Sequence, residues 1–381
     1  MADEQDAAAP TRPPRSGPDG ERRPDEEYLA DYYRWLADAE FHDHEPLYER
    51  VAHAMAEEPA LLDRLAPLAE PKFVPVLVNA AVHDLVLREP DQPLAAVYRT
   101  GDGDPWPAYR ALLVERFDEL AELVRHRSIQ TNEVGRTTAV VPALAEVHRA
   151  TGHPLALVEL GPSAGLNLVP DRYSVTYRDP GGRPVGRVGP AGSPVQLTCA
   201  LVGATPALVD RPPPIAWRAG LDRRPIDVRD PDARRWLQAC LWPSARDRAE
   251  RLEAALSLAV HDPPDLRTGD AVADLPALLA EVPTGLQVVV VATWVLAYLD
   301  DDDRHRLAAV LAGAGRPVAM ITGEYPGVAP WIPDAPRPAN APVGTGATLV
   351  GLGRWDGDAT EARALGWMQA HGRWLDWFDP T

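Results

Sequence analysis

A short turn rich in small residues is the segment of this sequence best suited to chemistry. Glu159, Gly161, Ser163, Gly165 and Asn167 end or follow an apolar run, HPLALVELG, that is typical of a buried parallel strand. We expect a helix to begin directly after the turn. Backbone N–H groups and the helix N-terminus could then approach a nucleotide-like ligand, and the acid could bind a ribose or an amino group.

The turn departs from a nucleotide-binding glycine pattern in two respects. In a G-x-G-x-G turn the middle residue is usually glycine, but here it is Ser163, and Pro162 lacks an N–H donor. A second interpretation therefore stays open, in which Gly161 and Gly165 only permit close packing of the strand against the helix.

A polar segment, QTNEVGR over residues 130–136, precedes the turn. Asn132, Glu133 and Arg136 fall on adjacent turns of a predicted helix start. Thr131 or Asn132 could cap that helix, and Glu133 with Arg136 could form no more than an intrahelical ion pair. The functional interpretation makes Glu133 catalytic and makes Asn132 and Arg136 ligands of the substrate.

Proton transfer near neutral pH favours a histidine as the base. His83 and Asp84 lie on an otherwise apolar predicted helix, NAAVHDLVLREPD. Because the ordinary pKa of histidine is about 6.5, His83 is suited by charge state to act as a catalytic base, with Asp84 beside it. The alternative is a hydrogen-bonded histidine of the core.

Three further candidates lie at predicted strand ends. Arg218, in WRAG, has a planar guanidinium that suits carboxylate, sulfate or phosphate. Glu324 and Tyr325, in TGEYPG, could line the same substrate site. We expect no metal site, because His42 and His44 in FHDHEP have a spacing that fits no helical ligand face.

The elements that must position these residues change character near residue 150. Apolar residues recur at helical spacing before that point, which predicts an all-helical region over 26–150. Residues 1–25 carry few large apolar side chains, and we expect a disordered tail. Over 151–381, apolar runs alternate with helical stretches, which predicts an α/β domain with a doubly wound, Rossmann-like sheet.

The α/β region predicts parallel core strands with two additions. Turn residues and β-prone runs predict a hairpin insertion at about 172–212. The Trp-rich segments ATLVGLGRWDG and LGWMQAHGRWLDWF predict two terminal strands that pair antiparallel, and a helix is expected over 294–315. The core strands are expected at 153–161, 215–220, 265–270, 286–292 and 316–324.

Composition limits the class of protein. The chain has 381 residues, 38 basic and 56 acidic side chains, and a net charge of −18 at pH 7. A protein that binds a nucleic-acid backbone normally has a surplus of Lys and Arg, so we expect no nucleic-acid partner. The few cysteines exclude a disulfide scaffold, and no apolar run predicts a membrane span or a signal peptide. We expect a soluble, cytoplasmic protein; homo- and hetero-oligomers both stay open.

Three stretches, RSIQTNEVGR, VELGPSAGLNLVPDRYSVTY and WRAGLDRRPIDVRDPDARRWLQACLWP, resemble the actinobacterial domain-of-unknown-function 2332 family. The resemblance extends from about Pro46 to the end of the chain. That family is similar in fold to class I methyltransferases that depend on S-adenosylmethionine (SAM), and its activity is largely unassigned. The sequence departs from the family at Pro162, where alanine is usual, and near Thr293, where the family has a histidine.

The resemblance implies a cofactor site at the carboxyl edge of the sheet. The glycine turn would form its first wall. Asp222, after the second strand, would bind the ribose, although an ion pair with a neighbouring arginine is an alternative. Asp270 and Ala271 would flank the adenine, and residues 292–294 would lie over the transferring group.

Three functions stay open at the level of sequence. One is SAM-dependent methylation of a small molecule, and another is a non-catalytic, methyltransferase-like partner subunit. We prefer a tailoring enzyme of secondary metabolism, such as antibiotic biosynthesis, that needs no cofactor and acts on a small anionic substrate. In it an amine displaces a sulfate or phosphate ester within one molecule and closes a small ring such as an aziridine. Arg136 or Arg218 would hold the departing anion.

Overall fold

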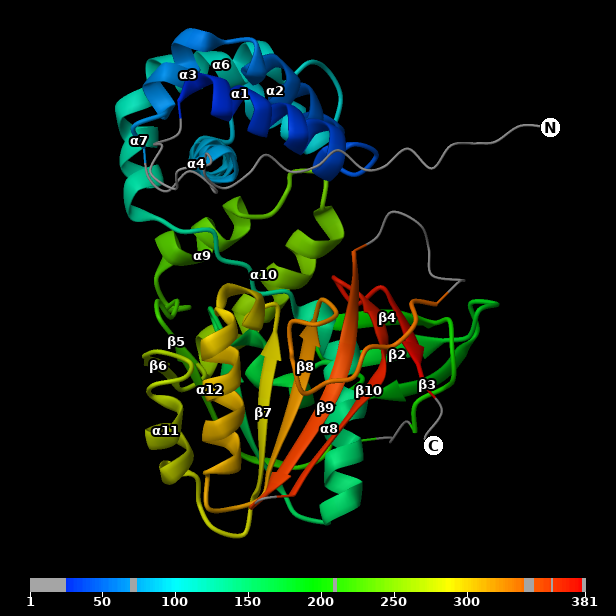
Figure 1. Ribbon diagram of the computed structural model, residues 1–381. Helices are drawn as coiled ribbons and strands as arrows, with labels where there is room; N and C mark the ends of the chain where they lie inside the picture. Colours follow the sequence, from blue (N-terminus) through cyan, green and yellow to red (C-terminus); the bar gives the residue numbers. More distant parts are fainter. Residues whose placement is uncertain (1–24, 69–73, 208–210, 339–345, 358, 379–381) are drawn as a thin grey trace, which may run out of the picture. The chain divides into compact units, whose positions relative to one another are not determined.

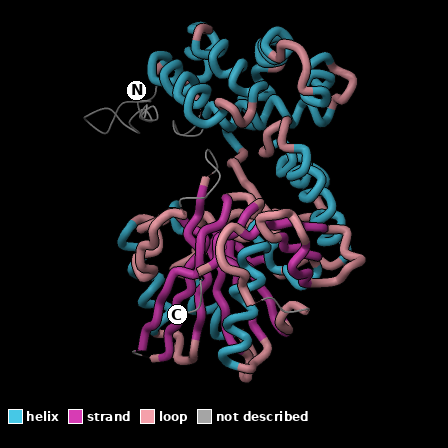
Figure 2. Tube along the Cα trace, turned by 90° about the vertical axis from the view of Figure 1, so that its right-hand side faces the viewer, coloured by secondary structure: helices cyan, strands magenta, loops and turns pink. Residues whose placement is uncertain are grey.

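The computed structural model describes residues 25–68, 74–207, 211–338, 346–357 and 359–378. They divide into two compact units, each described by itself. A helical unit comprises the residues up to Thr131 together with Pro231–Ala249, and an α/β unit comprises Asn132–Asp230 and Glu250–Thr381. Figure 2 shows this division, with helices alone in one unit and all the strands in the other. The tail expected over 1–25 lies outside the described residues except for Asp25.

The helical unit is built from short amphipathic helices around one apolar core. Proline occupies the first helical position of four of them, α2, α3, α5 and α9, where the missing N–H would have no partner within the helix. α4 is buried along most of its length and forms the centre of the core. The helices are α1 (Glu26–Trp35), α2 (Pro46–Ala56), α3 (Pro59–Leu65), α4 (Val74–Arg88), α5 (Pro93–Thr100), α6 (Trp106–Glu115), α7 (Phe117–His126) and α9 (Pro231–Ala239).

The observed boundary between the two units is not at residue 150, where the sequence predicted it, and two packing contacts explain the difference. α8 (Thr137–Thr151) packs against strands of the sheet, so it belongs to the α/β unit. α9 packs on α4, and the buried indole of Trp236 donates to the carbonyl oxygen of Ser128 at 2.9 Å. α10 (Arg246–His261) continues from one unit into the other.

The α/β unit contains one eleven-stranded sheet in the order β3-β2-β4-β11-β10-β9-β8-β7-β1-β5-β6. The five predicted core strands are confirmed. Taken in chain order they lie as 3-2-1-4-5, the order of a doubly wound sheet, so the predicted Rossmann-like α/β class is confirmed. The core strands are β1 (Leu155–Leu160), β5 (Ile215–Asp222), β6 (Leu266–Thr268), β7 (Gln287–Thr293) and β8 (Val318–Glu324).

The two faces of the core sheet carry different helices. α11 (Leu275–Glu281) and α12 (Asp301–Ala312) share one apolar cluster with alternate residues of β1, β7 and β8 (Figure 1). The other residues of β1, among them Glu159, point to the opposite face. α8, which contacts β7 and β8, packs on that face and begins at the carboxyl ends of the strands.

Two additions extend the core sheet. β2 (Ser174–Arg178) and β3 (Pro184–Val188) form the predicted hairpin, followed by β4 (Gln196–Leu201). β9 (Ala347–Asp356) and β10 (Ala359–Gln369) pair antiparallel as predicted. The second Trp-rich segment also contains a strand that the prediction missed, β11 (Trp374–Trp377), which follows a turn at Gly372 and pairs with both β10 and β4.

One predicted helix start is wrong, and one predicted helix begins later than the stretch that was expected to form it. In the described chain between β1 and β2 there are two 3-10 turns, Leu166–Leu168 and Pro170–Arg172, and no α-helix. Positive φ angles at Gly161, Ser163 and Gly165 keep the backbone out of the helical region, and proline follows shortly after. The helix expected over 294–315 begins at Asp301, because Asp300 caps it by accepting from the N–H of Asp303 at 2.7 Å.

The turn between β10 and β11 approaches the 3-10 turn before α8 closely, at Gly372 and Gly135. Gly372 has φ of 74°, and a Cβ there would overlap the carbonyl oxygen of Gly135. Gly285 also has a positive φ, of 81°, but nothing lies near its Cβ position.

We therefore expect different costs from the same substitution at these two sites. G285A should lower the free energy of unfolding by roughly 1–2 kcal/mol, the cost of a left-handed backbone. G372A adds overlap with main-chain atoms and should cost roughly 3–4 kcal/mol. Urea unfolding of both variants measures this, and equal costs would contradict the close approach.

Candidate functional site

A buried arginine lies at the carboxyl edge of the sheet. Arg136 ends a 3-10 turn, Val134–Arg136, that leads into α8, and the residue is 7% exposed. Its Nη1 donates to the carbonyl oxygen of Thr293 at 3.0 Å, and its Nε donates to that of Ala370 at 3.2 Å. The guanidinium thus joins the end of β7 to the turn between β10 and β11.

Two buried carboxyl groups interact with the charge of Arg136. Glu159 is 4% exposed, and burial raises its pKa to about 8, although a hydrogen bond from Asn167 and the charge of Arg136 oppose the shift. Glu324 is 3% exposed, and burial raises its pKa to about 7. Its Oε1 accepts the N–H groups of Val295 and Leu296 at 2.8 and 3.0 Å. Both carboxyl groups therefore titrate close to neutral pH.

One carboxyl oxygen of Glu159, Oε2, is buried and has no hydrogen-bond partner among the described residues. The same holds for Oγ of Ser163, whose backbone has a φ of 55°. Buried polar atoms of this kind are normally satisfied by water or a ligand, so the end of β1 can accept one more polar group.

A histidine and a carboxylate meet beside Arg136. The buried Glu133 accepts the N–H of Gly135 through Oε1 at 3.0 Å, and its Oε2 lies 3.3 Å from Nδ1 of His371. Nη2 of Arg251 lies 3.7 Å from Oε1 of Glu133. The side chain of His371 is 30% exposed, so the buried acid can orient an imidazole that faces solvent. Glu133, and not Thr131 or Asn132 as predicted, caps the turn before α8.

The sequence analysis missed His371. It lies in AHGR, in the turn after β10, where no local pattern distinguishes it from a surface residue. The fold alone brings it to Glu133. The one sequence signal is Gly372 beside it, which permits the close approach to Gly135.

Two aromatic rings lie at the same edge. Trp294 follows β7 with φ of 60°, a backbone strained for a tryptophan, and its ring centroid is 5.0 Å from that of Tyr325. The Arg136 guanidinium carbon lies 5.4 Å from the Trp294 ring centroid. The Trp294 Nε1 donates to Oγ1 of Thr348 at 3.1 Å, and Tyr325 is exposed. The predicted site residues Tyr325, Glu324 and Arg136 thus belong to one neighbourhood.

The glycine turn is filled by protein side chains. A Cβ on Gly161 would overlap Val295, and a Cβ on Gly165 would overlap Pro264 and Leu266. These contacts explain why both positions need glycine without invoking a ligand. They support the packing interpretation of the turn and do not fit a nucleotide lying against its backbone.

Side chains predicted to bind the cofactor (Asp222 and Asn167) or the substrate (Asn132) form hydrogen bonds within the same loops. Asp222 accepts the N–H of Ser163 through Oδ2 at 2.9 Å and that of Arg224 through Oδ1 at 2.7 Å. Asn132 accepts the N–H of Leu166 at 3.0 Å. Asn167 accepts the hydroxyl of Thr137 at 3.4 Å. These bonds hold the turn in place.

Asp270 and Ala271 follow β6. The carboxylate of Asp270 accepts the N–H groups of Val272 and Ala273 and pairs with Arg223 at 2.7 Å. These contacts lower the pKa of Asp270 to about 2. The carboxylate of Asp270 therefore binds groups of the protein itself. Ala271 beside it is half-buried.

Arg218 lies in the middle of β5 and not at its end, because the strand continues to Asp222. Its guanidinium binds both oxygens of Asp171, at 2.8 and 3.1 Å, and donates to the carbonyl oxygen of Leu168 at 3.0 Å. An anion at Arg218 would have to displace Asp171.

His83 and Asp84 belong to the helical unit. Nδ1 of His83 lies 3.0 Å from the carbonyl oxygen of Leu241, and burial lowers the pKa of His83 to about 4. It is therefore neutral at physiological pH, as expected of a hydrogen-bonded core histidine. Asp84 is buried and pairs with Arg88 at 3.0 Å and Arg235 at 2.8 Å.

Comparison with known families places the chain in one of them. A family model described as "Uncharacterized protein conserved in bacteria (DUF2332)" matches residues 30–377, so the chain belongs to this family. The resemblance in the three sequence stretches is thereby confirmed. A search of the curated proteins found no match. Within the described ranges, no helix has the length and apolar character needed to cross a membrane.

The raised pKa of Glu159 predicts a specific dependence of stability on pH. The folded protein keeps this proton up to about pH 8, whereas the unfolded chain releases it near 4.5. The contribution of Glu159 is thus complete below that lower value and is lost as the pH rises through about 8. Thermal unfolding of wild type and E159Q across this range should show a steeper loss of stability in wild type. The exposed Glu361, changed in E361Q, serves as control, and parallel curves for wild type and E159Q would contradict the assignment.

Proposed function

We propose that this member of the family is an enzyme acting on a small molecule that carries both an amine and a sulfate or phosphate ester. The amine nitrogen attacks the carbon that bears the ester. An N–C bond forms as the C–O bond breaks, and the anion leaves with the electron pair of that bond. The nitrogen then gives up a proton to a base, and the product is a small ring such as an aziridine.

The pairing of His371 with Glu133 beside Arg136 carries this proposal. The Glu133 carboxylate, 3.3 Å from Nδ1, would orient the imidazole so that Nε2 takes the proton from the amine. The charged carboxylate would also stabilise the imidazolium that results. In this proposal His371 is the base, and Glu133 becomes a positioning residue. His83 is unsuited because burial lowers its pKa to about 4.

Arg136 supplies the charge for an anionic leaving group. A buried cation is costly unless negative charge compensates it, and the carbonyl oxygens of Thr293 and Ala370, which accept two of its N–H groups, carry no net charge. Glu159 and Glu324 can each be protonated near neutral pH, since burial raises the pKa of both. When these carboxyl groups take up a proton, the positive charge of Arg136 is no longer neutralised and can stabilise an anion. A departing sulfate or phosphate requires such stabilisation.

The same geometry weighs against SAM. The glycine turn that would receive the cofactor is packed against Val295, Pro264 and Leu266. Asp222, the candidate for the ribose, holds the backbone of Ser163 and Arg224. The residues present do not fit this cofactor, and we derive no step through it. We further propose that the reaction is a tailoring step of secondary metabolism.

Ethanolamine O-sulfate is the simplest probe of the reaction. Wild type should release sulfate and aziridine, measured by ion chromatography and NMR, and H371Q should lower the rate by about 10²–10⁴-fold because a general base is lost. E133Q should lower the rate less and alter the pH profile, because the imidazole is no longer oriented. H261Q, at an exposed histidine of α10, should leave the rate unchanged.

Two outcomes would contradict the proposal. One is equal sulfate release by wild type and H371Q. The other is micromolar binding of SAM or S-adenosylhomocysteine in calorimetry, which would favour methyl transfer.

A further inference from the structure

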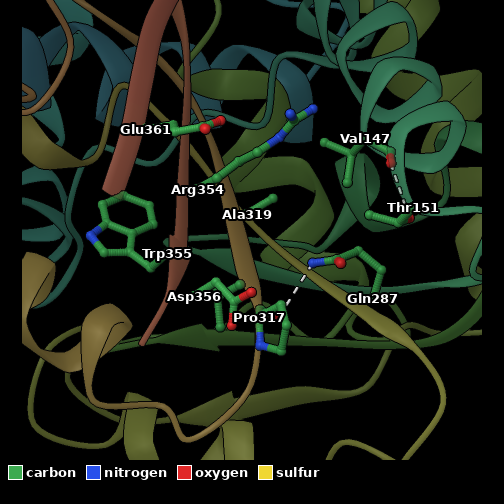
Figure 3. Close-up of a pocket in the computed structure, with 10 residues that line it drawn as sticks. Val147, Thr151, Gln287, Pro317, Ala319, Arg354, Trp355, Asp356 and Glu361 are labelled. Atoms are coloured by element: carbon green, nitrogen blue, oxygen red, sulfur yellow. Dashed lines mark hydrogen bonds between the residues drawn. The ribbon is translucent and has the colours of Figure 1, made fainter. Parts of the chain in front are cut away.

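A cavity lies at the amino edge of the sheet, at the opposite ends of β7 and β8 from Arg136. It has a volume of about 290 Å³. Figure 3 shows side chains from α8, β7, β8, β9 and β10 around it. β7 is seven residues long, so roughly 20 Å of strand separates the cavity from the carboxyl edge. The residues lining it are Val147, Thr151, Gln287, Pro317, Val318, Ala319, Arg354, Trp355, Asp356 and Glu361.

The guanidinium of Arg354, which lines this cavity, has an N–H donor, the buried Nε, without an acceptor among the described residues. Nη2 of Arg354 lies 4.0 Å from Glu146, and Glu146 is also paired with Arg363. A buried guanidinium N–H without an acceptor is unfavourable, and a ligand carboxylate is the acceptor that best matches its geometry.

Two carboxylates and an apolar wall complete the lining. Glu361 lies directly opposite Arg354 in the pairing of β9 with β10, and Asp356 lies two residues farther along β9. Figure 3 shows Glu361 and Arg354 at one end of the cavity and Asp356 at the other. Val147 and Ala319, which is paired with Arg354, contribute apolar surface. The cavity thus presents positive charge, negative charge and an apolar wall to one occupant.

We propose that this cavity binds a free α-amino acid with a small apolar side chain, about the size of leucine. The ligand carboxylate bonds to Arg354, its ammonium group to Glu361 or Asp356, and its side chain lies against Val147 and Ala319. The volume agrees, because at roughly 30 Å³ for each water-sized group the cavity holds a molecule of about nine or ten non-hydrogen atoms. The site shares no residue with the proposed active site, so this proposal does not depend on the proposed function.

Calorimetry with three matched probes tests the proposal. Leucine should bind to the wild-type protein, whereas N-acetylleucine, which lacks the ammonium charge, and leucinamide, which lacks the carboxylate, should each bind at least about tenfold more weakly. R354Q should weaken leucine binding by a similar factor. R187Q, at an exposed arginine of β3, is the matched control and should bind leucine as wild type does.

Three results would overturn the proposal. They are no binding of leucine, valine or methionine at millimolar concentration, equal affinity for leucine and N-acetylleucine, or unchanged affinity in R354Q. If R354Q does not fold, E361Q at the exposed rim and the two leucine analogues decide the question without it.

Discussion

The carboxyl edge of the sheet is organised around one buried positive charge. Arg136 reaches from the start of α8 to the carbonyl oxygens of Thr293 and Ala370, so three segments distant in sequence are fixed by a single guanidinium. A charge with so little exposure must be compensated. Glu159 and Glu324 interact with it, and their raised pKa values mean that the compensation varies with protonation.

The position of Arg136 also explains why a histidine can act here. Its bond to Ala370 holds the turn that carries His371, and Gly135 and Gly372 allow that turn to approach α8. Glu133 then meets the imidazole. The net charge of −18 therefore describes the chain as a whole and not this edge, where an arginine lies among carboxyl groups that can be neutral.

The sequence predicted the sheet well because buried parallel strands are continuous apolar runs bounded by glycine and acid. The sequence-based prediction failed after β1, where the backbone conformation of the turn prevented the helix that the local sequence favoured. Positive φ angles at Gly161, Ser163 and Gly165 replaced the expected helix with 3-10 turns. The site was predicted in part: Glu133, Arg136, Glu159 and Glu324 come together. His371 could not be found, because only the strand pairing of β9, β10 and β11 brings it to Glu133.

The central claim is that the cluster around Arg136 binds an anion with the help of carboxyl groups that titrate near neutral pH. Calorimetry of inorganic sulfate near pH 8, in two buffers of different ionisation enthalpy, measures proton exchange on binding. A bound anion raises the pKa of Glu159 further, so the account predicts proton uptake in wild type and less uptake in E159Q. Absence of sulfate binding, or binding with no proton exchange, would contradict it.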